Sequence, residues 1–309
     1  LFGVLRLLFD RTTAVWGTLW SLVMPIGLAL TVAALPDTLS YALLFAAWYT
    51  FLRALPAGRW RARLGWFALA GALYGAAIFT HKMNLLWVLV FTGLVVRGWL
   101  QETTGRPATG VVPNLRRFAT WSLPGLAVVP TALVFLLLFA RALTGAGHAA
   151  DLAGGLRVVL TGESGPDFLG KLKHLQLTAI LFPVTIGSLG LPALPVAAWA
   201  IWRRRDRAQL ALCVPIVIVL FASTLYYYTG AGGRMSLPAL FLLAGLLVAE
   251  GRRLMEAIPV PQRFLLLAAG GILAIVPPAL NSANLAWRMV TQPAPLAEMR
   301  RILAQPQVI

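Results

Sequence analysis

Long apolar runs alternate with short polar segments along most of this chain. A transmembrane helix needs about 20 residues to cross the hydrocarbon core of a bilayer, which is about 30 Å thick. The runs therefore predict an all-α fold, a polytopic transmembrane helical bundle of about nine spans. Their expected bounds are 14–34, 38–56, 65–81, 84–100, 119–141, 176–201, 209–229, 236–250 and 264–281. Prolines inside these runs are compatible with this fold because neighbouring helices satisfy the freed carbonyl groups.

The composition favours a membrane protein over a soluble one. Of 309 residues, 59% are hydrophobic and only 12% are charged. Length alone would predict two soluble domains, but repeated apolar runs of this length are typical of membrane helices. The single cysteine, Cys213, lies within an apolar run, so it predicts neither a disulfide framework nor a cysteine-based metal site. We interpret Cys213 as a small buried apolar side chain.

The basic residues predict the orientation of the spans. With residues 1–13 on the cytoplasmic side, 17 of the 26 lysines and arginines fall inside. Seven of the other nine lie in or beside a long outer loop or the C-terminal tail, where the positive-inside rule is weak, and the short outer turns carry only Lys82 and Arg234. The net charge of +16 thus reflects arginines at helix ends, and we expect no nucleic-acid partner. The chain is expected to be a multi-pass protein of the cytoplasmic or inner membrane.

Two regions are expected along the chain. Residues 1–281 hold the predicted spans, and residues 282–309 have the character of the start of a C-terminal segment on the outer face. The sequence begins at Leu1 without a methionine, and the opening stretch LFGVLRLLF resembles the end of a segment that started earlier. We therefore expect an N-terminal part, with the first spans and the first outer loop, to precede Leu1.

Three ionisable residues lie at helix ends on the predicted outer face. Asp37, in AALPDTLSYALLF, is the only acidic residue between positions 10 and 102. Lys82 follows His81 in THKMN, and Arg234 follows the glycines of YYYTGAGGR. Each residue alone is explained as a solvated helix end, and Pro36 with Asp37 suits a helix start, where an acid meets the positive end of the helix dipole. Their shared face is the reason to consider a common site.

A lipid-linked phosphate is the ligand that suits these groups best. A polyprenyl phosphate places its phosphate at the headgroup level, where Lys82 and Arg234 can pair with it and Arg234 can do so in a bidentate manner. A carboxylate such as Asp37 can accept the proton of an attacking hydroxyl. Tyr228 is either a residue of the interfacial aromatic belt or a stacking surface for a sugar. The residues therefore predict binding of a lipid-linked phosphate at the outer face, with the bilayer as the second partner.

Four stretches, taken in order, resemble the membrane glycosyltransferases of the GT-C type. They are LFGVLRLLFDRTTAVWGTLW, LPDTLSYALLFAAWYTFLRAL, an arginine-rich loop and GALYGAAIFTHKMNLLWVLV. The protein O-mannosyltransferase and aminoarabinose-transferase-like group has an aspartate at the head of a helix and a later helix of the form G…G…tK. Asp37, Gly71, Gly75 and Lys82 match these positions. GGRMSLPALFLLAGLLVAEG is similar to the group's R-Y-x-x-P helix, with Arg234 matching its arginine.

The resemblance implies transfer of a sugar from a polyprenyl-phosphate donor to a protein, lipid or glycan acceptor on the extracytoplasmic face, with inversion by direct displacement. The group's main catalytic carboxylate lies in a first outer loop that this chain does not contain, so the chain alone is expected to be inactive. Asp37 would then be a second carboxylate, which either orients the acceptor or helps to hold a divalent metal if the enzyme uses one. No cofactor is assigned beyond that open role.

Two positions depart from the pattern of that group. Met235 stands where a tyrosine is usual, and His81 precedes the lysine where a small or hydroxyl residue is commoner. His81 is either a metal or phosphate contact, or a neutral, hydrogen-bonded histidine at the membrane interface. Both it and Tyr228 are therefore accessory candidates beside Asp37, Lys82 and Arg234.

Two other functional classes fit the hydropathy. A transporter or flippase of a lipid-linked or small anionic substrate should place ionisable residues or helix breaks near the membrane midplane. The predicted spans instead carry their charges at the ends. A membrane scaffold without activity would leave the shared face of Asp37, Lys82 and Arg234 as a coincidence. The placement of the charges therefore favours the glycosyltransferase.

Overall fold

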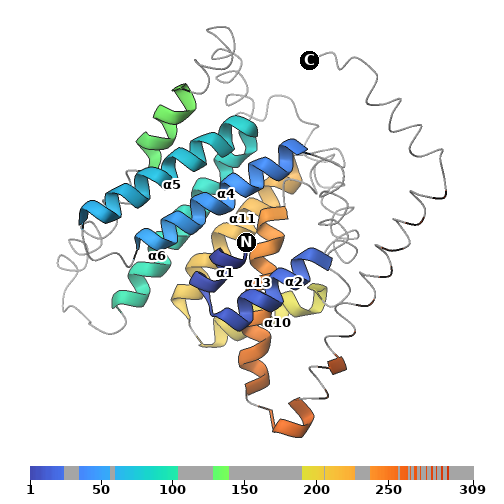
Figure 1. Cartoon of the computed structure of the whole chain (residues 1–309). Helices are drawn as coiled ribbons and strands as arrows, with labels where there is room; N and C mark the ends of the chain where they lie inside the picture. The colour runs from blue at the N-terminus through green and yellow to red at the C-terminus, as the bar shows by residue number, and fades with distance from the viewer. Residues whose placement is uncertain are drawn as a thin grey trace.

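The computed structural model describes residues 1–23, 35–55, 60–103, 128–138, 190–204, 206–226, 237–256 and 258–263, with scattered residues between 265 and 291. This described part is helical and holds no strand, so the all-α prediction is confirmed for it. The elements, shown in Figure 1, are α1 (Phe2–Leu8), α2 (Arg11–Val23), α4 (Leu35–Ala54), α5 (Trp60–Thr80), the 3-10 helix η1 (Lys82–Trp87), α6 (Val88–Thr103), α10 (Gly190–Arg204), α11 (Arg207–Tyr226) and α13 (Leu237–Glu256). A further short apolar helix, Val128–Leu138, carries no label.

Two helical stretches of the described part are long and apolar enough to cross a membrane. They are Arg61–Thr80 and Asn84–Gln101, and they correspond to the predicted spans 65–81 and 84–100. The second stretch begins in η1 and continues into α6. Three more helices, α4, α11 and α13, are each 20 residues long and overlap other predicted spans. The remaining spans fall partly or wholly outside the described residues, so the number of nine stays a prediction.

Acidic side chains cap the beginnings of two helices. The Asp10 carboxylate accepts hydrogen bonds from the backbone N–H of Thr13 at 2.8 Å and from the Thr13 hydroxyl at 2.9 Å. Asp206 accepts a hydrogen bond from the backbone N–H of Gln209 at 3.1 Å. Each carboxylate satisfies a donor that the first turn of its helix leaves without an intrahelical partner. These caps explain why α2 and α11 begin at positions 11 and 207, a few residues before the bounds predicted from hydropathy.

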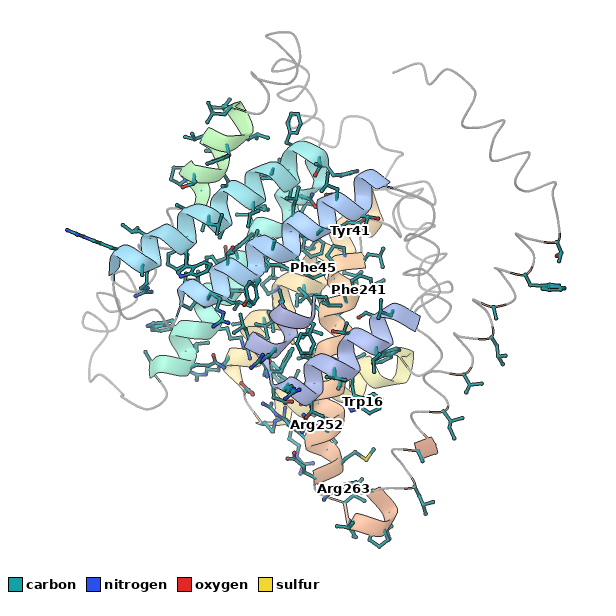
Figure 2. The ribbon with its side chains drawn as sticks, viewed as in Figure 1. Trp16, Tyr41, Phe45, Phe241, Arg252 and Arg263 are labelled. Carbon is teal, nitrogen blue, oxygen red and sulfur yellow. The ribbon has the colours of Figure 1, made fainter. Side chains whose placement is uncertain are left out.

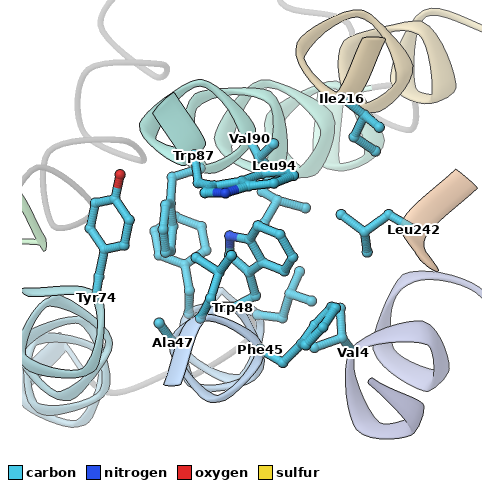
Figure 3. Close-up of a cluster of buried hydrophobic side chains, with 14 of the residues drawn as sticks. Val4, Phe45, Ala47, Trp48, Tyr74, Trp87, Val90, Leu94, Ile216 and Leu242 are labelled. Carbon is cyan, nitrogen blue, oxygen red and sulfur yellow. The ribbon is translucent and has the colours of Figure 1, made fainter. Parts of the chain in front are cut away.

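An aromatic face of α4 forms the centre of the core. Phe45, Trp48 and Phe51 are buried and recur every three residues, so they lie on one side of the helix. The rings of Trp48 and Trp87 meet edge-on with 5.3 Å between centroids, and Figure 3 shows this pair in the middle of the cluster. Phe51 meets Phe91 in the same way at 5.1 Å. Each aromatic pair contributes about 0.5–1.5 kcal/mol beyond the area it buries, and together they hold α4 against η1 and α6.

Two glycines of α5 let a neighbouring helix approach its backbone. A Cβ atom at Gly71 would lie 2.6 Å from the carbonyl oxygen of Val128, and one at Gly75 would lie 2.5 Å from that of Ala132. Their four-residue separation is the small-xxx-small spacing by which membrane helices pack closely. The two glycines that match the glycosyltransferase pattern therefore have a packing role, since they seat the helix Val128–Leu138 on α5.

Large apolar side chains also cover outward faces of the bundle. Examples are Trp16 on α2, Leu133 and Leu137 on the helix that packs against α5, and Trp202 on α10, all of them exposed. Single exposed apolar residues are ordinary on soluble proteins. Apolar side chains on the outward faces of several helices, by contrast, form surface that needs a partner such as lipid or protein.

Candidate functional site

Two of the predicted site residues, Asp37 and Lys82, fall at one end of the bundle, in elements whose backbone the structure describes. Asp37 is the third residue of α4, and Lys82 is the first residue of η1. The side chains of both lie outside the described part of the structure. Tyr228 and Arg234 lie wholly outside the described residues. The structure therefore places the backbones of Asp37 and Lys82. The side-chain contacts of all four residues stay predictions.

α4 begins three residues earlier than the hydropathy predicted, at Leu35 instead of position 38. A proline is compatible with the first turn of a helix because its missing N–H would have no intrahelical partner there. Pro36 is therefore compatible with the first turn of α4, and Asp37 follows it in the same turn. An acid at this position is stabilised by the positive end of the helix dipole, by about 0.3–1 kcal/mol.

His81 occupies the corner between α5 and η1. Its backbone N–H donates to the carbonyl oxygen of Ala77 at 3.0 Å, and its carbonyl oxygen accepts from the N–H of Asn84 at 3.0 Å. The first bond ends α5 and the second begins the 3-10 turn, so the backbone of His81 joins the two elements. Its side chain is partly exposed, as either of its two predicted roles requires.

Asn84 ties this corner to the first turns of α4. Its Nδ2 lies 2.5 Å from Ser40 Oγ and 2.6 Å from the carbonyl oxygen of Ala77, and it donates to both. The Asn84 and Ser40 side chains are buried, at 2% and 1% exposure. A buried amide that lost these partners would be left unsatisfied, which costs about 1–3 kcal/mol. The hydrogen bond therefore sets the position of α4 along η1, because a shift of either element would break it.

Tyr74 supports the same turn from α5. Its hydroxyl lies 2.8 Å from the carbonyl oxygen of Asn84 and 2.9 Å from that of Leu85, and it donates to this pair. The Tyr74 ring packs on Phe91 with 4.9 Å between centroids. The carbonyl groups of η1, which the tight 3-10 geometry leaves poorly paired, are thus satisfied by a side chain from outside the turn.

These contacts bring the backbones of Asp37 and Lys82 into one neighbourhood. Asp37 precedes Ser40 by three residues, which is less than one turn of α4, and Lys82 precedes Asn84 by two residues of η1. Because Ser40 and Asn84 are hydrogen-bonded to each other, the backbones of Asp37 and Lys82 both lie within three residues of this one contact. The sequence had suggested a shared face for them from the alternation of spans alone.

No family model, curated protein or solved structure matches this chain. The resemblance to GT-C glycosyltransferases therefore rests on the motifs in the sequence alone.

A metal site cannot be assigned to the described residues. They contain no group of three histidine, cysteine or acidic side chains that could hold an ion. The sequence had left a divalent metal open as one of two roles for Asp37. That role stays open, because the Asp37 side chain and the segments around Arg234 are outside the described part.

Ser40 and Asn84 were not identified from the sequence. Both are small polar residues near the ends of apolar runs, where a hydroxyl or an amide is ordinary. Their importance arises from a contact across 44 residues of chain, which no local pattern reveals. The one available signal was the cluster of polar residues in THKMN, from which the histidine and lysine were singled out but the asparagine was not.

We expect Asn84→Ala to lower the free energy of unfolding by about 2–4 kcal/mol, since it removes two buried hydrogen bonds, one of them to the Ser40 hydroxyl. Ser40→Ala should cost about 1 kcal/mol, and the double variant should cost less than the sum. Denaturant unfolding in detergent, followed by tryptophan fluorescence, measures the difference. Ser21→Ala is the matched control, because its buried hydroxyl donates within its own helix, to the carbonyl oxygen of Gly17. Strictly additive effects of Ser40→Ala and Asn84→Ala would contradict the contact.

Proposed function

We propose that this chain is the transmembrane part of a GT-C type glycosyltransferase, which moves a sugar from a polyprenyl-phosphate donor to an acceptor on the extracytoplasmic face. The observation that carries the proposal is the Ser40–Asn84 hydrogen bond. It joins the helix whose first turn contains Asp37 to the turn that begins with Lys82. A carboxylate and a cation, the two charges that such a transfer requires, thus start from neighbouring backbone positions.

The membrane location is supported by two kinds of observation. Two helical stretches, Arg61–Thr80 and Asn84–Gln101, are long and apolar enough to cross a bilayer. Exposed apolar side chains on other helices, such as Leu137 and Trp202, give the bundle outward faces suited to lipid. We place the protein in the cytoplasmic or inner membrane as a multi-pass protein, with the end that carries Asp37 toward the extracytoplasmic side.

The proposed reaction is a direct displacement at the anomeric carbon of the donor sugar. The acceptor oxygen forms a bond to that carbon while the bond from carbon to phosphate oxygen breaks, so that polyprenyl phosphate leaves with the electron pair. Lys82 and Arg234 stabilise the charge that gathers on the departing phosphate. Asp37 orients the acceptor hydroxyl or holds a metal ion beside it, and the proton passes to a carboxylate of the first outer loop. His81 and Tyr228 line the approach to the sugar as accessory contacts.

The test uses the protein with any residues that precede Leu1 in its natural chain, reconstituted in vesicles with a panel of polyprenyl-phosphate sugars labelled in the sugar. Protein-dependent release of polyprenyl phosphate, with label appearing in an acceptor, is the expected result. Accessibility of the intact labelled lipid to periodate added outside is measured in the same vesicles. Movement of the intact lipid between leaflets without cleavage would overturn the proposal in favour of a flippase.

A further inference from the structure

A polar pocket of about 320 Å³ lies at the end of the bundle remote from Asp37. It is bounded by the corner between α1 and α2, the last turns of α6 and α13, and the beginning of α11. Figure 2 shows the separation, with Tyr41 near the start of α4 at one end and Arg252 on α13 toward the other. Pockets of about 300–1,000 Å³ are the usual size for small-molecule sites. This one has no role in the proposed sugar transfer.

Arg97 is the most unusual residue of the pocket. Its exposure is only 6%, and its Nε–H has no hydrogen-bond partner among the described residues. Its Nη2 donates to the carbonyl oxygen of Leu8, and its guanidinium lies over the ring of Phe9 at 5.5 Å from the centroid. Neither contact supplies a negative charge. Among the described side chains, no carboxylate forms an ion pair with Arg97.

Three carboxylates line the pocket, those of Asp10, Asp206 and Glu256, and two of them are already paired with arginines that also line it. Asp10 binds Arg252 at 2.7 Å, and Asp206 lies 3.6 Å from Arg253. Partial burial raises the pKa of Asp10, but the hydrogen bonds from Thr13 and the charge of Arg252 outweigh it and hold that pKa below its usual value. Asp10 is therefore ionised and committed to Arg252 at neutral pH.

An unpaired guanidinium in a buried position is costly. Removing an ion from water costs several kcal/mol unless an opposite charge and hydrogen bonds compensate it. The charge of Asp206 acts on Arg97 from a distance, but Asp206 itself lies beside Arg253. Among the described residues Arg97 therefore lacks an ion-pair partner, although its side chain lines a pocket with room for a ligand. An anion in the pocket would supply it.

The start of α11 adds further donors to the same pocket. Ala208 and Gln209 line it, and the backbone N–H of Ala208 belongs to the first turn of a 20-residue helix, where no intrahelical acceptor exists. The Gln209 side chain is 3% exposed, and its Oε1 has no hydrogen-bond partner in the part of the chain that the structure describes. Because the amide oxygen and nitrogen are assigned by their contacts, the opposite orientation would present an N–H at this point. Arg97, the Gln209 amide and the first turn of α11 therefore line one space, with the capping carboxylate of Asp206 beside them.

We propose that this pocket binds a phosphate group, with Arg97 as the principal ligand and Gln209 and the first turn of α11 as supporting donors. A phosphate oxygen accepts the Nε–H of Arg97 in a charge-assisted hydrogen bond. The phosphate belongs either to a phospholipid headgroup, which the position at the helix ends makes accessible, or to a soluble phosphorylated molecule. The site is separate from the proposed donor site and does not depend on it.

The first experiment measures thermal unfolding of the full chain, with any residues that precede Leu1, in detergent free of phospholipid. Inorganic phosphate, glycerol phosphate and mixed micelles with phosphatidylglycerol are titrated separately. Sodium chloride at equal ionic strength and phosphatidylcholine micelles serve as controls. A saturable rise in Tm with phosphatidylglycerol alone supports the headgroup as the source, and a rise with the soluble phosphates supports a soluble ligand. No saturable rise with any of the three phosphates overturns the proposal.

The second experiment repeats the titrations on variants. Arg97→Met is expected to raise the Tm without phosphate, because it removes a buried charge that has no ion-pair partner among the described residues, and to weaken the apparent phosphate affinity at least tenfold. Arg97→Lys keeps a charge without the guanidinium donors and should weaken it severalfold, as should Gln209→Leu. Arg203→Gln, an exposed arginine on α10 that stacks on Trp199, should respond as the wild type. Unchanged phosphate responses in Arg97→Lys and Gln209→Leu would overturn the assignment even if Arg97→Met failed to fold.

Discussion

Asp37→Asn is expected to reduce the rate of sugar transfer at least 100-fold while leaving the unfolding temperature within a few degrees of the wild type. The substitution keeps the size of the side chain and removes its charge. As a helix-start residue Asp37 contributes only about 0.3–1 kcal/mol, whereas a carboxylate that handles a proton or orients the acceptor contributes about 10²–10⁴ in rate. A helix-cap role therefore predicts a change in stability, whereas a catalytic role predicts a change in the rate of sugar transfer.

The measurement compares initial rates of polyprenyl phosphate release with thermal unfolding of the same preparations. Arg53→Gln is the matched control, because Arg53 is the charged residue in the last turn of the same helix and is exposed. It should retain the wild-type rate. If Asp37→Asn lost a few degrees of stability but kept full activity, Asp37 would be a helix cap and the site would have to be sought elsewhere.

Gly75→Ala is expected to destabilise the protein by about 1–3 kcal/mol, whereas Gly65→Ala on the same helix should be neutral or stabilising. The added Cβ at position 75 would lie 2.5 Å from the carbonyl oxygen of Ala132, so the helix Val128–Leu138 has to move away. At Gly65 a Cβ would meet no atom within 4 Å. Alanine also favours a helix over glycine by about 0.5–1 kcal/mol. We therefore expect the alanine substitution to lower the stability at position 75 but not at position 65, ten residues earlier on the same helix.

Chemical denaturation of the two variants in the same detergent gives the comparison, and Gly71→Ala provides a second position in the close contact. Its Cβ would lie 2.6 Å from the carbonyl oxygen of Val128, so it should resemble Gly75→Ala. Equal behaviour of positions 65 and 75 would mean that the short helix is not seated on α5 in the folded protein. The match of these glycines to the glycosyltransferase pattern would then need an explanation other than packing.

The sequence predicted the helical class and the approximate position of several helices, because apolar runs long enough to cross a bilayer leave few alternatives. Helix ends were predicted less well. α13 continues to Glu256, six residues beyond the predicted end at position 250. Glu250 is buried there and pairs with Arg204 and Arg253, so a charge that hydropathy takes as the end of a span is compatible with a helix that continues.

The site was predicted only in outline. The alternation of spans suggested that Asp37 and Lys82 share a face, but the Ser40–Asn84 hydrogen bond that joins their elements depends on the packing of α4 on α5. Arg97 shows the same limit more strongly. From the sequence, Arg97 counted among the 17 basic residues predicted on the cytoplasmic side, whereas in the folded chain it is 6% exposed and lines a pocket. Burial of a charged residue results from long-range contacts, so no local pattern predicts it.

The contacts at the two ends of the bundle differ greatly in their separation along the chain. The contact between Ser40 and Asn84 spans 44 residues, and the Tyr74 bonds to the same turn span 10 and 11. The Asp10–Arg252 pair at the other end spans 242 residues. Contacts between nearby residues close small loops and form early, whereas distant ones wait until both partners have been synthesised. The Ser40–Asn84 contact therefore needs only the first part of the chain and can form while the ribosome is still adding the later helices, whereas the Asp10–Arg252 pair beside the phosphate pocket has to wait for α13.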